Sequence, residues 1–508
     1  MSINDALYIA TSGLANINQG FAVISQNVAN AGNIDYAREV PTSTSMSAGN
    51  LEMGVRTGPV RREVNLQLQA NLFLQNSASA ALTTRQTALQ VIDSVQGTPG
   101  AGSDLPSLLG KLQSTFSTLV SDPASQTQQQ AVVAAAGALA GQINTLSAAY
   151  QSARQNAQDA MVADVSTLNQ TLATIQGLSQ QIILGKSLGQ STADTENQRD
   201  AAIHSLTQLV DVRVIPQANG DIQMLTGTGL SLPSINSGAQ FALAAATTGA
   251  NAFYPGGGLP GITLNGSDVT GQLTGGRIGA NVTLRDITLP TYQAETDEFA
   301  QTLSSRFDAQ GLTLFTDATG VRPVSSGPPV QTGYVGYGLT VRVNPAVVAT
   351  PRLVRDGTQA IAGSGTGASA FTPNPAGGSS GFNMLAQRIL DFALGAQAQS
   401  GVPQPLPNMT ALRPAGTLTA LFTATSTLQA FSVSLVNSQA QDSAATSTEQ
   451  AAQTALQSSL QSKLSAASGV NIDSEMATMI QLQNAYGANA KVISGVQAMW
   501  TALLAIVP

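Results

Sequence analysis

The sequence contains no cysteine, one histidine and few charged residues, and each scarcity excludes a class of site. Without cysteine there are no disulfides, thiolate zinc sites, iron–sulfur clusters or cysteine nucleophiles. His204, the single histidine, has no second imidazole with which to form a metal site. Lys+Arg 21 against Asp+Glu 28 gives a net charge of −7, so the chain lacks the basic surface that phosphate backbones require. We therefore expect no metal, no cofactor and no nucleic-acid partner.

The composition favours assembly over catalysis. Charged residues make up 10% of the chain and aromatic residues 4%, whereas hydrophobic residues reach 43%. The apolar share is therefore mostly small and aliphatic, and Ser, Thr, Asn and Gln supply most of the polarity. Such surfaces let helices approach closely without charge repulsion. At 508 residues the chain is long enough for about three domains of ~150 residues. Catalysis is not excluded by the composition, but its usual residues are nearly absent.

The start of the chain does not have the pattern of a secretory signal peptide. Met1–Ala10 has no basic start and no long apolar core. The longest run of small apolar residues, Ala131–Gly141, is far short of the ~20 residues of a membrane-spanning helix. We expect no membrane insertion. Two alternatives remain at this point: a cytosolic protein, or export by a route that cleaves no signal.

The two ends of the chain carry apolar residues at heptad spacing. The N-terminal seam comprises Leu7, Ala10, Leu14, Ile17, Phe21, Ile24 and Val28. The last stretch, 472–507, has two adjacent seams. One comprises Met476, Met479, Tyr486, Ala490, Ile493, Trp500, Leu504 and Val507, and the other comprises Leu482, Ala485, Val492, Val496, Met499, Leu503 and Ile506. Two seams are too wide for one partner helix, which indicates packing between subunits or a bundle closed by both ends of the chain.

Between the ends, the pattern is helical, then rich in short strands and turns, then helical again. Helices are predicted over 64–94, 105–120, 124–158, 159–185, 194–210, 284–309, 382–394 and from 427 onward, with a break at Ser468-Gly469. Residues 40–62 are expected to be extended, Asn219-Gly220 to form a hairpin turn, and Leu339–Asn344 to form a strand. The predicted fold is mainly α with a β-rich middle, an α+β multidomain chain.

We predict three domains. Residues 1–40 and 465–508 form a terminal helical, coiled-coil domain. Residues 41–210, 283–310 and 382–464 form a bundle of long helices, and residues 211–282 and 311–381 form an inserted, β-rich outer domain.

Three motifs suggest chemistry but are better explained by structure. His204 lies in an amphipathic stretch without a second ligand, so we interpret it as a structural or surface residue. Glu196 and Asp200 are four apart with Arg199 beside them, which predicts a helix-start cluster or salt bridge and not an acid–base pair. Gly185-Lys-Ser-Leu-Gly189 matches the spacing of a hydrolase nucleophile elbow, but a helical pattern precedes it where the elbow needs a strand. We predict a break between helices there.

The termini resemble bacterial flagellar rod, hook and hook-associated proteins, the axial family of the flagellum. At the N-terminus, Ser12-Gly13-Leu14 is followed by Asn27-Val-Ala-Asn30-Ala, Tyr36 and Arg38, although the usual Thr-Pro-Gly before the tyrosine is replaced. The C-terminal string is the stronger match and runs Ser468-Gly-Val-Asn-Ile-Asp-Ser-Glu475-Met476, then Gln483-Asn-Ala-Tyr486-Gly-Ala-Asn489-Ala-Lys-Val-Ile493. We predict an assembly interface at the seam and motif positions Leu7, Leu14, Ile17, Phe21, Ile24, Asn27, Val28, Asn30, Tyr36, Met476, Met479, Tyr486, Ala490, Ile493, Trp500 and Leu504.

The interior is similar to the hook-associated members of this family. The similar segments are Glu196-Asn-Gln-Arg-Asp200 with Leu209-Val-Asp-Val212, Gly275-Gly-Arg-Ile-Gly279, and Phe307-Asp-Ala-Gln-Gly311. The resemblance implies a structural protein at the hook–filament junction, not an enzyme and without a substrate or cofactor. It also implies a location outside the cell and export in the unfolded state through the flagellar type III apparatus with a chaperone. It implies contacts with further copies of itself, with the hook protein and with hook-associated protein 3. The alternatives are a hook or rod protein, which β-dominated structure would support, or an axial scaffold carrying a secreted enzyme.

Overall fold

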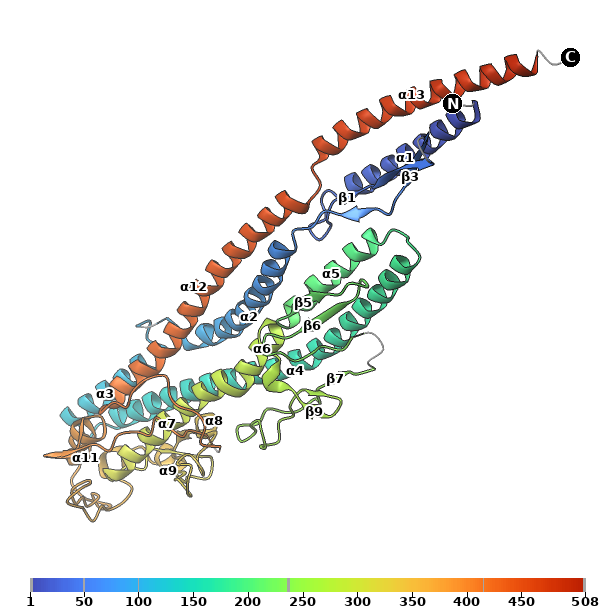
Figure 1. Ribbon diagram of the computed structural model, residues 1–508. Helices are drawn as coiled ribbons and strands as arrows, with labels where there is room; N and C mark the ends of the chain where they lie inside the picture. Colours follow the sequence, from blue (N-terminus) through green and yellow to red (C-terminus); the bar gives the residue numbers. More distant parts are fainter. Residues whose placement is uncertain (1–2, 49–50, 99, 235–237, 414, 506–508) are drawn as a thin grey trace.

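Both ends of the chain lie at the same end of an elongated molecule (Figure 1). The computed structural model describes residues 3–48, 51–98, 100–234, 238–413 and 415–505. Within these ranges the chain is mostly helical, with several two- and three-stranded sheets. The seam residues Ile506 and Val507 lie outside the described residues.

Long helices build most of the molecule. They are α1 (Ile3–Ala29), α2 (Leu66–Gln96), α3 (Leu105–Ser121), α4 (Gln126–Ser187), α5 (Ala193–Leu209), α7 (Leu289–Ala309), α12 (Leu428–Ser468) and α13 (Ile472–Leu504). Short helices complete the set: α6 (Gly276–Thr283), α8 (Tyr337–Thr340), α9 (Pro345–Ala349), α10 (Leu353–Asp356) and α11 (Met384–Arg388), with η1 (Thr270–Gln272), η2 (Leu284–Thr288) and η3 (Ile389–Ala393). Side chains that cap the first turn set several helix starts, at Asn65, Asp104, Ser125, Thr427 and Asn471.

The strands are short and antiparallel. Near the N-terminus, β1 (Glu39–Val40) pairs with β4 (Arg61–Arg62) and β2 (Ser43–Ala48) with β3 (Leu51–Thr57). Next, β5 (Arg213–Pro216) pairs with β6 (Ile222–Leu225), and β7 (Phe241–Ala242), β8 (Thr263–Leu264) and β9 (Ser267–Asp268) form three adjacent strands. Farther on, β10 (Phe315–Thr316) pairs with β11 (Arg342–Val343) and β12 (Gln397–Gln399) with β13 (Val402–Pro403).

We call α2 to α12, with their strands and loops, the body. Helix α4 runs through the body and contributes to each of its three apolar cores. Its first part packs with α3, the C-terminal half of α7, residues 312–354 and the start of α12 in one apolar core. Its middle packs with α2, η2 and Tyr292 in a second core, and its last part with α5, α6 and the segment 210–269 in a third. Residues 211–282 and 311–381, which we assigned to one outer domain, thus pack into different cores along α4, and the domain division itself remains a prediction.

Most helix predictions are confirmed, and two local predictions are wrong. The predicted helices over 124–158 and 159–185 are one continuous helix, α4. The predicted strand Leu339–Asn344 begins inside a helix, since residues 339–340 are the end of α8, and only Arg342–Val343 is a strand. The break at Ser468-Gly469, the break at Gly185–Gly189, where α4 ends at Ser187, and the hairpin turn at Asn219-Gly220 are confirmed.

Helix α4 also corrects the expectation that no segment is apolar enough to cross a membrane. By length and composition alone α4 meets that criterion, because Ala, Val, Leu and Ile continue well beyond Ala131–Gly141. It lies between α3, α5 and α7, and buried core helices meet the same criterion.

Candidate functional site: the terminal arm and its joint with the body

The helices α1 and α13 lie side by side and antiparallel (Figure 1). We use the name arm for these two helices together with the hairpin β2–β3. A Cβ added at Gly13 would lie 3.3 Å from the Asn489 amide, and one added at Gly20 would lie 2.7 Å from Leu482 Cδ1. One heptad further, the Asn27 amide donates to Glu475 Oε2 at 3.2 Å. The three contacts recur every seven residues along both helices, which is the spacing of a coiled-coil seam.

The glycines of α1 allow the two helices to approach closely. On α13, the residues that become buried or half-buried come from both predicted seams. Leu482 and Val496, which is 2% exposed, come from one seam, and the half-buried Met479 comes from the other. The hairpin covers another side of α1, since Ser12 Oγ accepts from the Val55 N–H at 3.2 Å and the Gln19 amide donates to the Gly58 carbonyl.

The predicted interface residues divide by burial within the arm. Ile17, Ile24, Asn27 and Tyr36 are buried; Leu7, Leu14, Phe21, Val28, Asn30, Met479, Ala490 and Ile493 are half-buried; Met476, Tyr486, Trp500 and Leu504 are exposed. Their role in assembly remains a prediction. The buried members stabilise the arm itself, so the exposed members are the ones available to another molecule.

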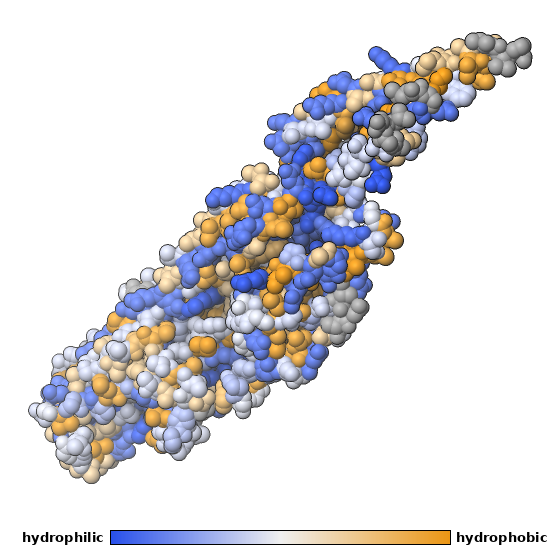
Figure 2. Space-filling model, in the orientation of Figure 1, coloured by the Kyte–Doolittle hydropathy of each residue, from blue (hydrophilic) through white to orange (hydrophobic). Residues whose placement is uncertain are grey.

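Several large apolar side chains of α13 remain exposed beside α1, on more than one side of the helix, and we call this set the stripe. Its members are Ile472, Met476, Ile480, Tyr486, Val492, Met499, Trp500, Leu503 and Leu504, each at least 36% exposed. Patches of orange lie among blue and white side chains along the arm in the space-filling view (Figure 2). Sequence reasoning missed Ile472 and Ile480, because they fall outside both heptad seams. Single apolar residues are normal on protein surfaces, but nine large exposed ones on one helix indicate an interaction surface.

Asn27 ties the turn after α1 to both helices of the arm. Its Oδ1 accepts from the Glu39 N–H at 2.9 Å and from the Tyr36 hydroxyl at 3.0 Å, and its Nδ2 also donates to the Glu39 carbonyl. The side chain is 1% exposed, so each of these bonds forms away from water. Burial and the nearby carboxylates of Glu39 and Glu475 raise the pKa of Tyr36, which keeps the hydroxyl a donor.

Glu475 links the C-terminal motif to the N-terminal one. Its carboxylate is 1% exposed and accepts from Arg38 Nε at 2.6 Å. Arg38 also pairs with Glu63 at 3.0 Å, and the hydrogen bond to Glu475 raises the pKa of Arg38. The motif residues quoted from opposite ends of the sequence therefore form one connected cluster.

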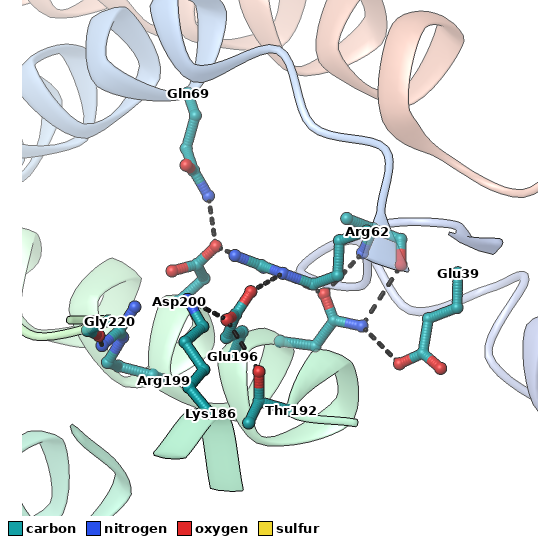
Figure 3. A network of polar contacts seen from close by, with 11 residues as sticks. Glu39, Arg62, Gln69, Lys186, Thr192, Glu196, Arg199, Asp200 and Gly220 are labelled. Atoms are coloured by element: carbon teal, nitrogen blue, oxygen red, sulfur yellow. Dashed lines mark hydrogen bonds and ion pairs between the residues drawn. The ribbon is translucent and has the colours of Figure 1, made fainter. Parts of the chain in front are cut away.

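The ribbon formed by β1 and β4 joins the arm to the start of α5 (Figure 3). Arg62 is bonded to Glu196 Oε2 at 3.1 Å and to Asp200 Oδ2 at 2.6 Å, and Asn197 exchanges hydrogen bonds with the Ala37 backbone. Gln69 on α2 also donates to Asp200. The predicted salt-bridge cluster at Glu196 and Asp200 is confirmed, and its cation comes from a distant strand.

Arg199, the residue we placed beside these acids, points elsewhere. It donates to the Gly220 carbonyl at 2.7 Å in the β5–β6 turn, whereas Lys186 at the end of α4 pairs with Glu196 at 3.0 Å. Burial alone would raise the pKa of Glu196, but the hydrogen bond from Lys186 and the charge of Arg62 outweigh it, so the pKa is lowered. Glu196 is therefore held as a carboxylate.

His204 has the structural role that we predicted. It lies on α5, partly buried, with Nδ1 2.6 Å from Asp35 Oδ1 in the loop after α1. Among the residues that the structure describes, no group of three or more His, Asp or Glu side chains is placed to hold a metal ion. The site is a set of contacts between segments that are distant in the sequence.

Two segments of the interior resemblance also meet in space. The Asp211 N–H donates to the Thr274 carbonyl at 3.2 Å, and the backbone of Gly275 and Gly276 lies against the end of α5. Both glycines have positive φ, at 70° and 56°, and a Cβ at Gly276 would approach Val210 N to 2.6 Å. Glycine is needed at position 276 because backbone occupies the place of a side chain.

Comparison with known proteins agrees with this geometry. Residues 89–320 match the family described as the flagellar hook-associated protein FlgK helical domain, and residues 461–506 match the flagellar basal body rod FlgEFG protein C-terminal family. The chain is 24% identical to flagellar hook-associated protein 1 of Escherichia coli over 98% of both chains.

Other similar proteins match over shorter regions. The chain is 27% identical to flagellar hook-associated protein 1 of Salmonella typhimurium over 46% of its own length, and the match spans 43% of that relative. A solved structure, that of the flagellar hook junction protein FlgK from Burkholderia pseudomallei, aligns over 50% of this chain and 45% of that chain, with a TM-score of 0.41 and 25% identity.

Proposed function

Because the chain belongs to the family of flagellar hook-associated protein 1, we propose that it is a structural subunit of the bacterial flagellum at the junction between hook and filament. There it acts as a mechanical adaptor on which the filament is assembled. The observation that carries this proposal is the arm: both terminal motifs join in one antiparallel helix pair whose apolar stripe no part of the described chain covers. A stripe of this kind is stabilised when another subunit buries it.

The long helices of the body favour the junction protein over a hook or rod protein. Helix α4 has 62 residues and α12 has 41, and the sheets have two or three short strands each. A body built on one continuous helix transmits force along its length without relying on loops. We propose that the arms of many copies form the inner part of the junction, that the helical body lies outside them, and that the β-rich stretches lie outermost.

The partners follow from this location. We propose that the arm binds the arms of further copies, and that the subunit contacts the hook protein on one side and hook-associated protein 3 on the other. Export would proceed through the flagellar type III apparatus, assisted by a chaperone, to a site outside the cell. Absence of cysteine suits this route because no disulfide forms during transit.

The test is to place a charge on the uncovered stripe. Tyr486→Asp and Trp500→Asp change side chains that are 43% and 36% exposed, so the arm and body should keep their fold. Each buried apolar side chain contributes ~1.5–3 kcal/mol to an interface, and an unpaired buried carboxylate costs several more. We expect secreted variant protein, hooks without filaments by electron microscopy, and flagellin monomer in the medium.

Gln497→Asp is the matched control, because it adds the same charge at an exposed polar position of the same helix. The control should leave filaments normal. Normal filaments in both stripe variants would contradict the proposed interface, and a lowered melting temperature of the body would mean that the substitutions act on folding.

A further inference from the structure

The arm meets the body without extensive helix packing. Within the described part of the chain, α1 and α13 make their extensive contacts with each other and with the first strands, and not with a helix of the body. Residues 58–65 lead from the hairpin of the arm to α2, and residues 469–471 join α12 to α13. Residues 30–42, between α1 and the hairpin, lie at the same joint. Figure 1 shows this narrowing between the arm and the tips of α4 and α5.

The contacts at this joint are polar. On the body side, Arg62 bridges to Glu196, Asn197 and Asp200, and His204 lies against Asp35. The Arg62, Glu196 and Asp200 side chains are 10%, 16% and 12% exposed, so the pairs are partly shielded from water. Strongly hydrophilic residues gather at the same narrowing in Figure 2.

The end of α12 is tied to the residues on either side of the β1–β4 ribbon. The Arg38 N–H donates to the Ser468 carbonyl at 2.8 Å, and Ser468 Oγ accepts from the Asn65 N–H at 2.9 Å. The end of α12 therefore follows the β1–β4 ribbon. Whatever holds the ribbon on α5 also sets the direction in which α13 leaves the body.

We propose that the cluster centred on Arg62 is an electrostatic latch that fixes the angle between arm and body. With the latch closed, the arm continues the long axis of the molecule. With the latch open, the arm and the attached β1–β4 ribbon pivot together about residues 63–65 and 469–471. The inference uses contacts within one chain and does not depend on the flagellar role.

A latch made of ion pairs differs from an apolar interface in one measurable respect. Charges released from the cluster are solvated by water, so opening exposes little apolar surface. Salt weakens partly exposed ion pairs, because the screening length falls from about 10 Å at 0.1 M to about 3 Å at 1 M. Added salt should therefore widen the range of angles between arm and body. It should not disrupt the apolar packing inside the arm or inside the body.

The experiment measures distances between spin labels in the full-length chain. The chain has no cysteine, so two introduced cysteines are the only labelled sites. Gln481→Cys on α13 and Ala173→Cys on α4 report the arm-to-body distance, and both positions are exposed. Gln481→Cys with Ser25→Cys on α1 reports the distance within the arm.

Arg62→Gln removes the cation of the latch, and Arg61→Gln is the matched control because it removes the same charge from the exposed neighbour on β4. In Arg62→Gln we expect the arm-to-body distance distribution to widen about twofold or more, with no further widening in 1 M salt. The unsubstituted chain and Arg61→Gln should be narrow at about 0.1 M salt and widen at about 1 M. The distance within the arm should stay narrow throughout.

Two results would overturn the proposal. An arm-to-body distribution that is equally narrow in Arg62→Gln and the control would mean that the cluster does not hold the angle. A distribution within the arm that widens together with the arm-to-body distance would mean that the arm is not a rigid unit and the joint is not the moving point.

Discussion

Raising the pH from mildly acidic to alkaline should destabilise the body, because α7 buries carboxyl groups that favour their protonated form. Glu295 and Asp297 are both 0% exposed. Burial raises the pKa of Asp297 from its ordinary 3.8 to about 7, although the N–H groups of Gly336 and Gly338 donate to it at 2.7 and 2.8 Å. Burial likewise raises the pKa of Glu295 from 4.5 to about 7, against a hydrogen bond from the Leu421 N–H.

The sign follows from proton linkage. Between the unfolded and folded pKa values, the folded body holds protons that the unfolded chain has released, so the free energy of unfolding falls as pH rises through about 7. The shifts correspond to at most ~4 kcal/mol for Asp297 and ~3 kcal/mol for Glu295. We expect a net loss on the order of 3–6 kcal/mol and a fall in melting temperature of roughly 5 °C between about pH 5 and about pH 8.

The assay is thermal melting followed by near-ultraviolet circular dichroism, which reports Tyr150, Tyr292, Tyr334 and Tyr337 in the body. The double variant Glu295→Gln, Asp297→Asn should flatten the dependence on pH, because neither side chain then titrates. Glu449→Gln, at an exposed position of α12, is the control and should keep the slope. Stability that rises over this pH range, or an unchanged slope in the double variant, would refute the reasoning.

Two further predictions concern glycines at close contacts. Gly276→Ala should destabilise the packing of α6 on the end of α5 by about 2–4 kcal/mol, because it places a Cβ at φ 56° against backbone atoms, and a denaturant melt should detect it. Gly271→Ala, with nothing within 4 Å of its Cβ, should change stability by less than about 0.5 kcal/mol. Gly20→Val should separate α1 from Leu482 and weaken the arm by about 1–3 kcal/mol, seen as faster hydrogen exchange in α1. Gly487→Ala, in open space on α13, should stabilise that helix by up to about 1 kcal/mol, and equal exchange in both arm variants would show that the close approach does not matter.

The sequence by itself determined the helices and where most of them end. Apolar periodicity and capping side chains act over a few residues, so α2, α3, α5 and the break at Gly469 follow from local pattern. The same reasoning failed at α8, where turn-rich sequence with alternating apolar residues fits strand and short helix equally. The terminal motifs also identified the residues that meet in the arm, since Asn27, Tyr36, Arg38 and Glu475 all lie within them.

Tertiary structure alone decided which residues of those patterns meet. The sequence offers two apolar seams on α13, and either could face α1. In the structure Gly13 and Gly20 lie against Asn489 and Leu482. The less exposed side of α13 therefore includes Leu482 from one seam and Met479 from the other. The partner of Glu196 and Asp200 is Arg62, more than 130 residues away, and not the adjacent Arg199. Local pattern carries no information on such pairs, because a side chain's direction is set by its helix while its partner is set by how distant segments pack.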